Sequence, residues 1–372
     1  MEDYIVMEPS HQVYGEQDRG HPMWLRVVSS CVCVLSVVGS AAIILSYALV
    51  RNMRSKAREL LVHISAMDLL YTTANLVGLA LPYREHLIPG HNGSSPSEYK
   101  VYHYICLTQA FVAIYGTVGS ILWTIGLAVY LYYRMVVMND AITRKVLAVL
   151  YIVCYGIPLY VCLWLLFTHG LGYSPDVSSG AGWCSLNTAN TKDGEHSVLL
   201  LIMTYDMWIF LGIMLLLPLY LSIYAEAKDQ EKKNLYFFMQ PAKSSNVDNR
   251  PERKLLIIPI IFLFLRIWDL VNDVIFLCHP DAKIRHHKWL LLLTAIGDSG
   301  QGFANFVIFF LLQQRLRYII MRCLSCGYCC HKRRWFLNIR NTTTADDLAE
   351  FSSSTLDHHS GSAQFSQYTG SN

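Results

Sequence analysis

Charged side chains interrupt several long apolar stretches of this chain, and their spacing suggests a place where chemistry is done. Arg266, Asp269 and Asp273 recur at spacings of three and four residues, so on a helix they fall within about 60° of one another. Asp206, in another apolar stretch, lies close to Trp208. Together these side chains could line a ligand pocket. The alternative is an internal ion pair of Arg266 with Asp269 or Asp273 that binds nothing.

A second group of polar side chains is expected nearer the middle of the same apolar stretches. Its members are Asp68, Asp298, Ser299, Gln301 and Asn305. Carboxylates and amides at one depth can hydrogen-bond to each other and hold helices together. Such a network could switch between two arrangements, or it could be static and serve only to join helices. The sequence leaves both interpretations open.

The stretches that carry these residues are long enough to cross a lipid bilayer as helices. Each has at least the roughly 20 residues that a membrane-spanning helix needs, and backbone groups in lipid must bond to one another. The seven stretches are Trp24–Val50, Leu60–Leu81, His103–Tyr133, Val146–Thr168, Val198–Tyr224, Leu255–Cys278 and Trp289–Leu312. Only 15% of the residues are charged, against about 25% in soluble domains. We therefore expect an all-α membrane protein, a seven-transmembrane-helix bundle.

Basic residues are distributed unevenly between the two sets of connecting segments. One set, which includes 225–254 and the C-terminal tail, contains 21 Lys and Arg residues, and the other set contains 7. The richer set is expected to be cytoplasmic. We therefore expect a multi-pass plasma-membrane protein with an extracellular N-terminus (1–23), the bundle (24–312) and cytoplasmic segments 313–340 and 341–372. The asymmetry favours contact with anionic lipid and not with nucleic acid.

Two cysteines lie on the expected outer side at a similar depth. Cys106 is at the outer end of the third apolar stretch, and Cys184 is in the longest outer loop. The extracellular side is oxidising, so a disulfide bond can form there. A bridge would fold the loop over the mouth of the bundle, and the alternative is two unpaired thiols. We expect the bridge.

The segment after the last apolar stretch carries signals for attachment to the inner leaflet. Residues 314–322 are expected to form a short amphipathic eighth helix. Four cysteines follow it, namely Cys323, Cys326, Cys329 and Cys330. Their spacing could hold zinc, but the adjacent helix and the basic residues after them favour S-acylation, so neither a metal nor a cofactor is expected. Segment 341–372 is rich in Ser, Thr and acidic residues and is expected to be disordered and phosphorylatable.

These features together resemble a G-protein-coupled receptor. The motif Tyr132-Tyr133-Arg134 lacks the acidic residue that precedes this Arg in the rhodopsin-like branch. The motif Gln301-Gly302-Phe303-x-Asn305 is similar to the secretin/adhesion and slime-mould cyclic-AMP receptor group. Further motifs similar to a member of this group are Leu60-Leu61-x-x-x-Ser65-Ala66-x-Asp68, Gly182-Trp183-Cys184, Leu256-Ile257-x-Pro259 and Leu265-Arg266-x-Trp268.

The resemblance implies a receptor and not an enzyme. An unknown extracellular ligand would trigger activation of a heterotrimeric G protein and second-messenger output, and arrestin would bind the phosphorylated tail. The competing class is an ion-coupled transporter or channel that uses the intramembrane carboxylates as an ion path. Inverted repeats would favour transport, and the sequence shows none.

Two glycosylation sequons test the expected orientation. Asn92 and Asn341 each begin an Asn-x-Ser/Thr sequence, the first in an expected outer loop and the second in the expected cytoplasmic tail. We predict that Asn92 carries glycan and Asn341 does not, because glycan is added only to segments on the outer side. Glycosidase treatment should shift the mass of the wild type and of Asn341→Gln, but not of Asn92→Gln. A shift that survives Asn92→Gln would contradict the orientation.

Overall fold

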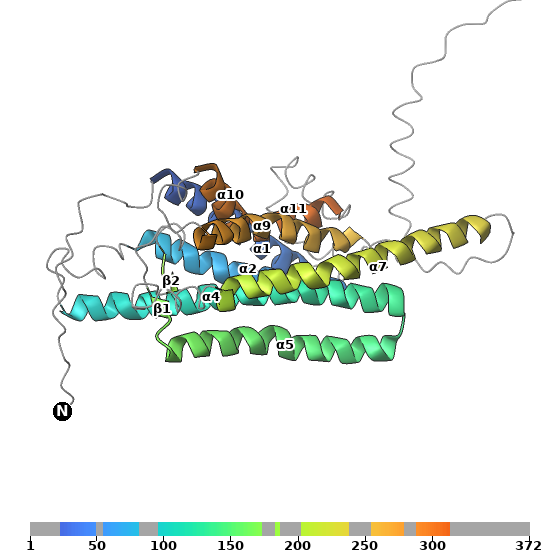
Figure 1. The fold of residues 1–372 in the computed structure, drawn as a ribbon, viewed down its shortest axis with the longest axis horizontal. Coiled ribbons are helices and arrows are strands. Elements are labelled where there is room, and N and C mark those ends of the chain that lie inside the picture. The colour runs from blue at the N-terminus through green and yellow to red at the C-terminus, as the bar shows by residue number, and fades with distance from the viewer. Residues whose placement is uncertain are drawn as a thin grey trace, which may run out of the picture.

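The computed structural model describes residues 23–49, 55–81, 96–172, 183–186, 202–237, 254–278 and 288–312. Within these ranges the chain forms an elongated bundle of helices whose long axes run in broadly the same direction (Figure 1). The helices are α1 (Met23–Leu49), α2 (Lys56–Ala80), α4 (Pro96–Tyr132), α5 (Asp140–Phe167), α7 (Met207–Phe237), α9 (Ile257–Cys278), α10 (Lys288–Ser299) and α11 (Gln301–Leu312). Shorter elements are the π-helical turns Tyr133–Val137 and Ile202–Asp206, the 3-10 turn Lys254–Leu256, and the strands β1 (Leu171–Gly172) and β2 (Ser185–Leu186).

Each of the seven apolar stretches contains a described helix, although not all of these helices are uniformly apolar. In the described residues, five helices are long and apolar enough to cross a membrane, namely α1, α2, α4, α5 and α7. The sixth stretch forms α9, which carries Arg266, Asp269 and Asp273 along one helix. The seventh stretch is divided into α10 and α11. The sixth and seventh stretches, which both differ from a simple apolar span, therefore carry most of the expected site residues.

Three helices extend beyond their expected boundaries by six residues or more. α4 has 37 residues, about 55 Å of helix, and begins at Pro96 instead of His103. α5 begins at Asp140 instead of Val146, and α7 continues to Phe237, so nearly half of the expected loop 225–254 is helical. Figure 1 shows α4 and α7 projecting from opposite ends of the bundle. Hydropathy marks where a helix leaves the lipid, but residues with high helix propensity, such as Ala225, continue it into water.

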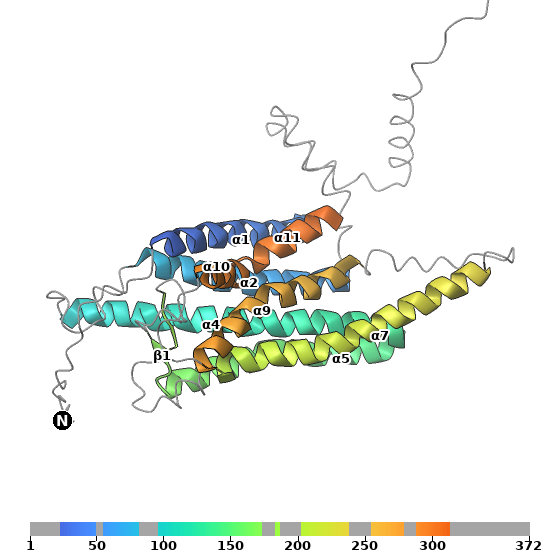
Figure 2. The ribbon, with the colours of Figure 1, turned by 45° about the horizontal axis from the view of Figure 1, so that its top comes forward.

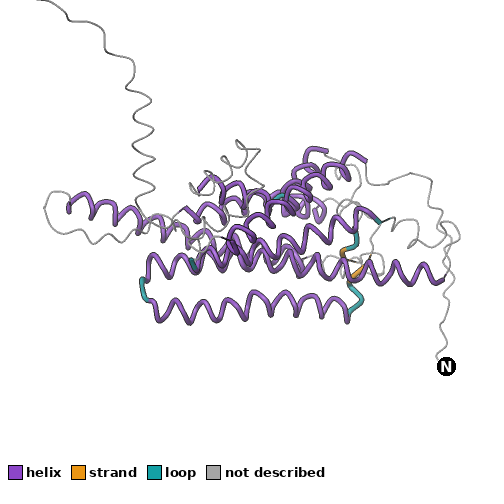
Figure 3. The backbone as a smooth tube through the Cα atoms, turned by 180° about the vertical axis from the view of Figure 1, so that it is seen from behind, coloured by secondary structure: helices purple, strands orange, loops and turns teal. Residues whose placement is uncertain are grey.

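A tight connection joins α4 to α5 and makes them antiparallel neighbours. Met138 adopts a left-handed conformation with φ 51°, and its amide donates to the carbonyl of Tyr133. Asn139 then caps α5, its side-chain oxygen accepting from the amides of Ala141 (3.0 Å) and Ile142 (3.2 Å). Figure 3 shows this connection as a short loop between two long helices.

α4 forms the centre of the bundle. In its most apolar segment 83% of the residues are buried within the protein, against 22% in that of α5. Trp123, Ile114 and Leu127 are fully buried along it. Hydrophobicity alone does not hold helices together inside a bilayer, so small residues that let backbones approach become important. Gly116 is such a residue, because a Cβ there would lie 2.8 Å from both the carbonyl oxygen of Met67 and the amide nitrogen of Tyr71 on α2.

Gly300 separates α10 from α11, and Figure 2 shows the change of direction between them. A break in a membrane helix leaves backbone groups that need other partners. Ser36 of α1 supplies one of them, because its hydroxyl accepts a hydrogen bond from the amide of Phe303 at 3.1 Å. α1 can approach this closely because Gly302 has no side chain to collide with the hydroxyl of Ser40. The break therefore places Asp298 and Gln301 at the junction of two differently directed helices.

The approach of α2 to α4 gives a test of this packing. We predict that Gly116→Ala destabilises the protein by about 1–3 kcal/mol, because the added methyl meets backbone atoms that cannot rotate away. Gly156→Ala is the matched control, since a Cβ at that exposed position on α5 meets nothing within 4 Å. Thermal unfolding of both purified variants in detergent measures the difference. Equal melting temperatures would contradict the packing.

Candidate functional site

An ion pair between the buried Arg266 of α9 and the partly buried Asp298 of α10 forms the centre of the site. The guanidinium of Arg266 donates through Nη1 to Oδ1 of Asp298, and the hydroxyl of Tyr71 on α2 donates to Oδ2 of the same carboxylate. The Arg266 guanidinium also lies 5.8 Å from the centre of the Tyr71 ring. Arg266 is only 2% exposed, so its charge is balanced inside the protein. The arrangement gives the partly buried carboxylate of Asp298 two donors and the buried guanidinium of Arg266 a counter-charge.

A second set of hydrogen bonds surrounds Asp68 on α2. Ser120 of α4 donates to Oδ1 of Asp68 at 2.5 Å, and the side-chain amide of Asn305 donates to Oδ2 at 3.0 Å. The amide of Gln301 in turn donates to the hydroxyl of Ser120 at 2.9 Å. All four side chains are buried. Asp68 therefore has a donor on each of its carboxylate oxygens.

Gln301 joins the two sets into one network. Its carbonyl oxygen lies 3.5 Å from Nη2 of Arg266, while its amide nitrogen bonds to Ser120. The joined network takes side chains from α2, α4, α9, α10 and α11, and we call it the interior network. Its members are Asp68, Tyr71, Ser120, Arg266, Asp298, Gln301 and Asn305. Any relative movement of α9 and α10 must strain or break the Arg266–Asp298 pair.

The structure groups these residues differently from the sequence interpretation. The sequence separated an upper group with Arg266 from a lower group with Asp298, whereas the structure pairs these two residues directly. The alternative was an ion pair of Arg266 with Asp269 or Asp273, and among the described contacts the salt bridge of Arg266 goes to Asp298 and not to Asp269. The side chain of Asp273 lies outside the described set. The carboxylate of Asp298 reaches the guanidinium from a neighbouring helix. Among the described contacts, Asp269, one turn further along the same helix, forms no salt bridge with Arg266.

Two members of the network, Tyr71 and Ser120, were missed. The neutral residues that the sequence analysis included in this group all lie in the seventh stretch, close after Asp298, whereas these two lie in other stretches. Tyr71 lies three residues after Asp68 and therefore near the same face of α2, which was an available signal. Ser120 lies in the third apolar stretch, which contains no charged residue, so only the tertiary structure identifies it.

The other expected site residues lie around the network without joining its hydrogen bonds. Ser299 is buried next to Asp298 on α10, and Asp206 is buried at the end of the π-helical turn Ile202–Asp206. Trp208 packs against the apolar core, and Asp269 lies one turn from Arg266 on α9. The Arg266 side chain is 2% exposed and the Asp298 side chain is 20% exposed, so the interior network is shielded from solvent only in part.

A disulfide bond fixes a loop over one end of the bundle, which we call the disulfide end. Cys106 near the start of α4 is bonded to Cys184, with 5.4 Å between their Cα atoms, which confirms the expected bridge. Cys184 precedes β2, and β2 pairs antiparallel with β1. Trp183, beside the bridge, packs against Leu25 of α1 and Leu79 of α2. The loop thus forms a lid anchored to three helices.

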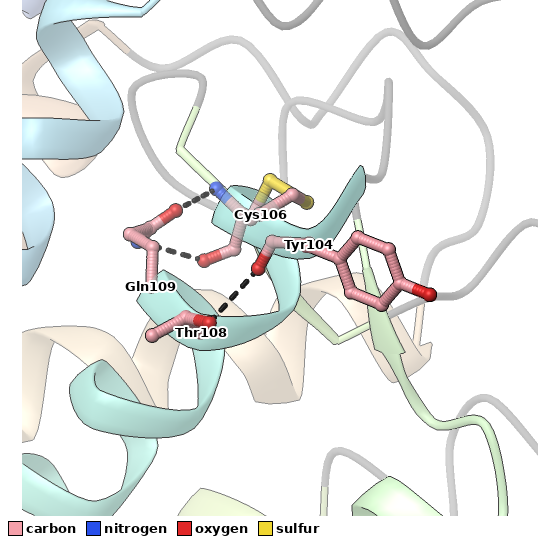
Figure 4. The surroundings of a disulfide bond; sticks show 5 residues. Tyr104, Cys106, Thr108 and Gln109 are labelled. Carbon is pink, nitrogen blue, oxygen red and sulfur yellow. Dashed lines mark hydrogen bonds between the residues drawn. A yellow bond between two sulfur atoms is a disulfide. The ribbon is translucent and has the colours of Figure 1, made fainter. Parts of the chain in front are cut away.

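Gln109 reinforces the lid by a pair of hydrogen bonds that the sequence analysis missed. Its side-chain oxygen accepts from the amide of Cys184 at 2.8 Å, and its side-chain nitrogen donates to the carbonyl of Cys184 at 3.1 Å. Figure 4 shows both bonds next to the bridge. Gln109 lies three residues after Cys106, so the two share a face of α4. The sequence signal that could have identified Gln109 was its position, a polar residue one helical turn from an expected disulfide.

Several expected site residues fall outside the described part of the chain. They are Asn92, the eighth helix, and the cysteines Cys323, Cys326, Cys329 and Cys330. Within the described ranges, no three or more His, Cys, Asp or Glu side chains are arranged to hold a metal ion. The expectations for glycosylation and acylation therefore stay predictions.

Comparisons with known proteins agree with this architecture. A family model described as "7 transmembrane receptor (Secretin family)" matches residues 23–304. The protein named G-protein coupled receptor 157 from Rattus norvegicus is 28% identical over 310 residues, which cover 82% of this chain and 86% of that protein. The protein of the same name from Mus musculus is 29% identical over 314 residues, covering 82% and 87%, and that from Homo sapiens is 28% identical over 297 residues, covering 78% and 82%.

A solved structure supports the fold alone. The crystal structure of squid rhodopsin aligns with a TM-score of 0.58 at 13% identity and covers 86% of this chain and 91% of that one. The seven-helix fold and the receptor resemblance expected from the sequence are therefore confirmed. The alternative class, an ion-coupled transporter or channel, finds no support in these matches.

The paired hydrogen bonds of Gln109 can be tested through the disulfide that they flank. We predict that Gln109→Ala makes the Cys106–Cys184 bridge more accessible to mild reductant, because the variant leaves two buried backbone groups unpaired at about 1–3 kcal/mol. Thr108→Ala is the control, since its hydroxyl bonds only to the carbonyl of Tyr104 in its own helix. Alkylation of released thiols followed by mass mapping measures the reduction rate. Equal reduction rates in the two variants would contradict the protection of the bridge by the hydrogen bonds of Gln109.

Proposed function

The chain belongs to the secretin family of seven-transmembrane receptors, and we propose that it signals through rearrangement of the interior network. As a G-protein-coupled receptor, it converts an external signal into activation of a heterotrimeric G protein. The observation that carries the proposal is that one guanidinium, Arg266, bonds to groups from two neighbouring elements, Asp298 of α10 and Gln301 of α11. A ligand that favours a different position of α9 must act against these bonds.

The mechanism is a shift between two packed arrangements. In the described arrangement α9 is joined to α10 by the Arg266–Asp298 pair, and α10 continues into α11 through the break at Gly300. A ligand moves this equilibrium only by its difference in affinity for the two arrangements. Packed interfaces change between discrete arrangements more readily than they deform continuously. Displacement of α9 would therefore break the bonds of Arg266 to Asp298 and Gln301 together and replace them with other partners.

The ligand is expected to act from the disulfide end. Asp269 follows Arg266 by one turn in the direction of that end, and Asp206 stands at the start of α7 near Tyr205, whose hydroxyl lies 3.2 Å from that of Ser185 in the lid. These contacts connect the lid to the element that carries Asp206. We include Asp206, Trp208, Asp269 and Asp273 in the ligand-contacting region, with Arg266 at its base.

The G protein is expected to bind at the opposite end of the bundle. There the π-helical turn Tyr133–Val137 presents Arg134, which pairs with Asp140 of α5 at 2.6 Å, and α7 projects beyond its neighbours. Both members of this pair are solvent-exposed, so the pair is weak and can be exchanged for a partner's groups. This end faces the cytoplasm in the proposed orientation, with the N-terminus outside the plasma membrane.

The remaining partner assignments rest on the sequence alone. Basic residues in the cytoplasmic segments would contact anionic lipid, S-acylation of the cysteine cluster would hold segment 313–340 at the membrane, and the phosphorylated tail would bind arrestin. The family is one of receptors, which supports a role without enzymatic chemistry.

Neutralising one partner of the central ion pair tests the proposal. We predict that Asp298→Asn raises basal G-protein activation per surface receptor about fivefold, because weakening the link between α9 and α10 by about 1 kcal/mol shifts the arrangement by that factor. Asp68→Asn should also raise it, since Ser120 and Asn305 lose their charged acceptor. Surface labelling and a panel of G-protein biosensors in the same cells give the output per receptor.

The control for these variants is Lys100→Gln, which removes an exposed charge at the disulfide end of α4. It should leave both surface level and output unchanged. If Asp298→Asn and Asp68→Asn lower only the surface level and leave output per receptor unchanged, the network joins helices without switching, and the proposed mechanism is wrong.

A further inference from the structure

A groove of about 430 Å³ opens sideways between α2 and α4 at the disulfide end, away from the interior network. Ala74 and Val77 of α2 form one wall, and Tyr104, Thr108 and Val112 of α4 form the other. Val77 is 48% exposed and Tyr104 is 67% exposed. Both helices belong to the membrane-spanning bundle, so the groove faces the bilayer and not the inside of the receptor. Its occupant must therefore come from the lipid phase.

The groove runs from the membrane interface towards the hydrocarbon. Gly78 of α2 lies level with Gln109 of α4, since a Cβ on Gly78 would contact the Gln109 side chain. Tyr104 precedes Gln109 by five residues and therefore lies about 7 Å nearer the disulfide end. Val112 lies on the opposite side of that level, so the α4 wall is about 12 Å long. Tyrosine is enriched at membrane interfaces, where its hydroxyl reaches water and its ring stays in lipid.

The polar side chains of the walls are almost all satisfied within the protein. Thr73 donates to the carbonyl of Leu69 at 2.6 Å, and Thr108 donates to that of Tyr104 at 2.9 Å. The amide of Gln109 is held by the backbone of Cys184. In the described part of the chain, the Tyr104 hydroxyl makes no hydrogen bond, and its ring points away from the disulfide (Figure 4). The groove is thus apolar along its length with one available hydroxyl at its interfacial end.

The walls are also fixed in place before any ligand arrives. The Cys106–Cys184 bridge and the Gln109 bonds tie this part of α4 to the lid, and Trp183 of the lid packs against Leu79 of α2. A preformed groove favours a rigid occupant, because a flexible acyl chain loses conformational entropy when it is held in one shape.

We propose that this groove binds a membrane sterol, with the sterol hydroxyl hydrogen-bonded to Tyr104 and the ring system lying against Ala74, Val77 and Val112. A sterol supplies the combination that the groove presents, a single hydroxyl at the interface and a rigid apolar body about as long as the α4 wall. The small side chains of Ala74 and Thr108 leave room for a flat ring system. The site requires only that the bundle crosses the membrane, so it does not depend on the proposed signalling mechanism.

Photolabelling of the full-length receptor in lipid nanodiscs tests the proposal. A diazirine analogue of cholesterol should label peptides from α2 and α4, and unlabelled cholesterol should compete. Thr108→Trp and Val77→Trp fill the groove from separate helices at exposed positions and should abolish this labelling. Tyr104→Phe keeps the ring and removes the hydroxyl, which should weaken labelling about three- to tenfold. Ile152→Trp, at a 74% exposed position on α5, is the control and should label as the wild type does.

Three results would overturn the proposal. Labelling at α2 and α4 that persists in both tryptophan variants would place the probe elsewhere. Competition by a phosphatidylcholine as effective as that by cholesterol would identify the groove as a general contact for acyl chains. Cross-linking of two receptor copies through these helices would identify it as a surface for self-association. The Cys106–Cys184 bridge, assayed in each variant, confirms that the folded receptor is being measured.

Discussion

The ion pair of the buried Arg266 with the partly buried Asp298 is the constraint on which the rest of the bundle depends. A guanidinium that is almost fully buried is tolerated only with a counter-charge and good hydrogen bonds. Supplying them requires α10 to lie against α9, and Gly297 permits this because any Cβ there would run into the carbonyl of Leu265. The same need explains the break at Gly300, which lets Asp298 and Gln301 reach Arg266 from two helices. The seventh stretch is thus interrupted where the charge must be satisfied.

Hydrogen bonds extend outward from that pair through side chains that each bond to two partners. Gln301 accepts from Arg266 and donates to Ser120, and Ser120 in turn donates to Asp68. A buried network of this kind is costly when its members are left unpaired, and within the described residues Nε of Arg266 is the one buried side-chain nitrogen or oxygen of this network that lacks a hydrogen-bond partner. The arrangement is therefore cooperative, and a change at one end disturbs all five helices that contribute to it. Cooperativity of this kind is what a two-arrangement receptor needs.

The sequence predicted the features that follow from composition and missed those that follow from tertiary approach. The seven spans came from apolar length, the Cys106–Cys184 bridge from the shared outer position of the two cysteines, and the grouping of Asp68 with Asn305 from their expected depth. The partner of Arg266 was missed, because which helix faces it is decided by close packing at Gly297. Neutral partners such as Tyr71 and Gln109 were missed because only the tertiary structure shows what they contact. Helix ends in water were also missed, since hydropathy reports only the span within lipid.

Gln109 shows how one side chain can determine two surfaces at once. Its amide would make the groove between α2 and α4 partly polar if it were free to face the lipid. Because both its oxygen and its nitrogen are bonded to Cys184, the same bonds that hold the lid leave the groove lined by hydrocarbon. The closed lid and the apolar groove are therefore linked properties of α4. If the lid opened and released Gln109, a polar group would return to the groove wall. The lipid-facing side of the bundle would then become more polar at the disulfide end.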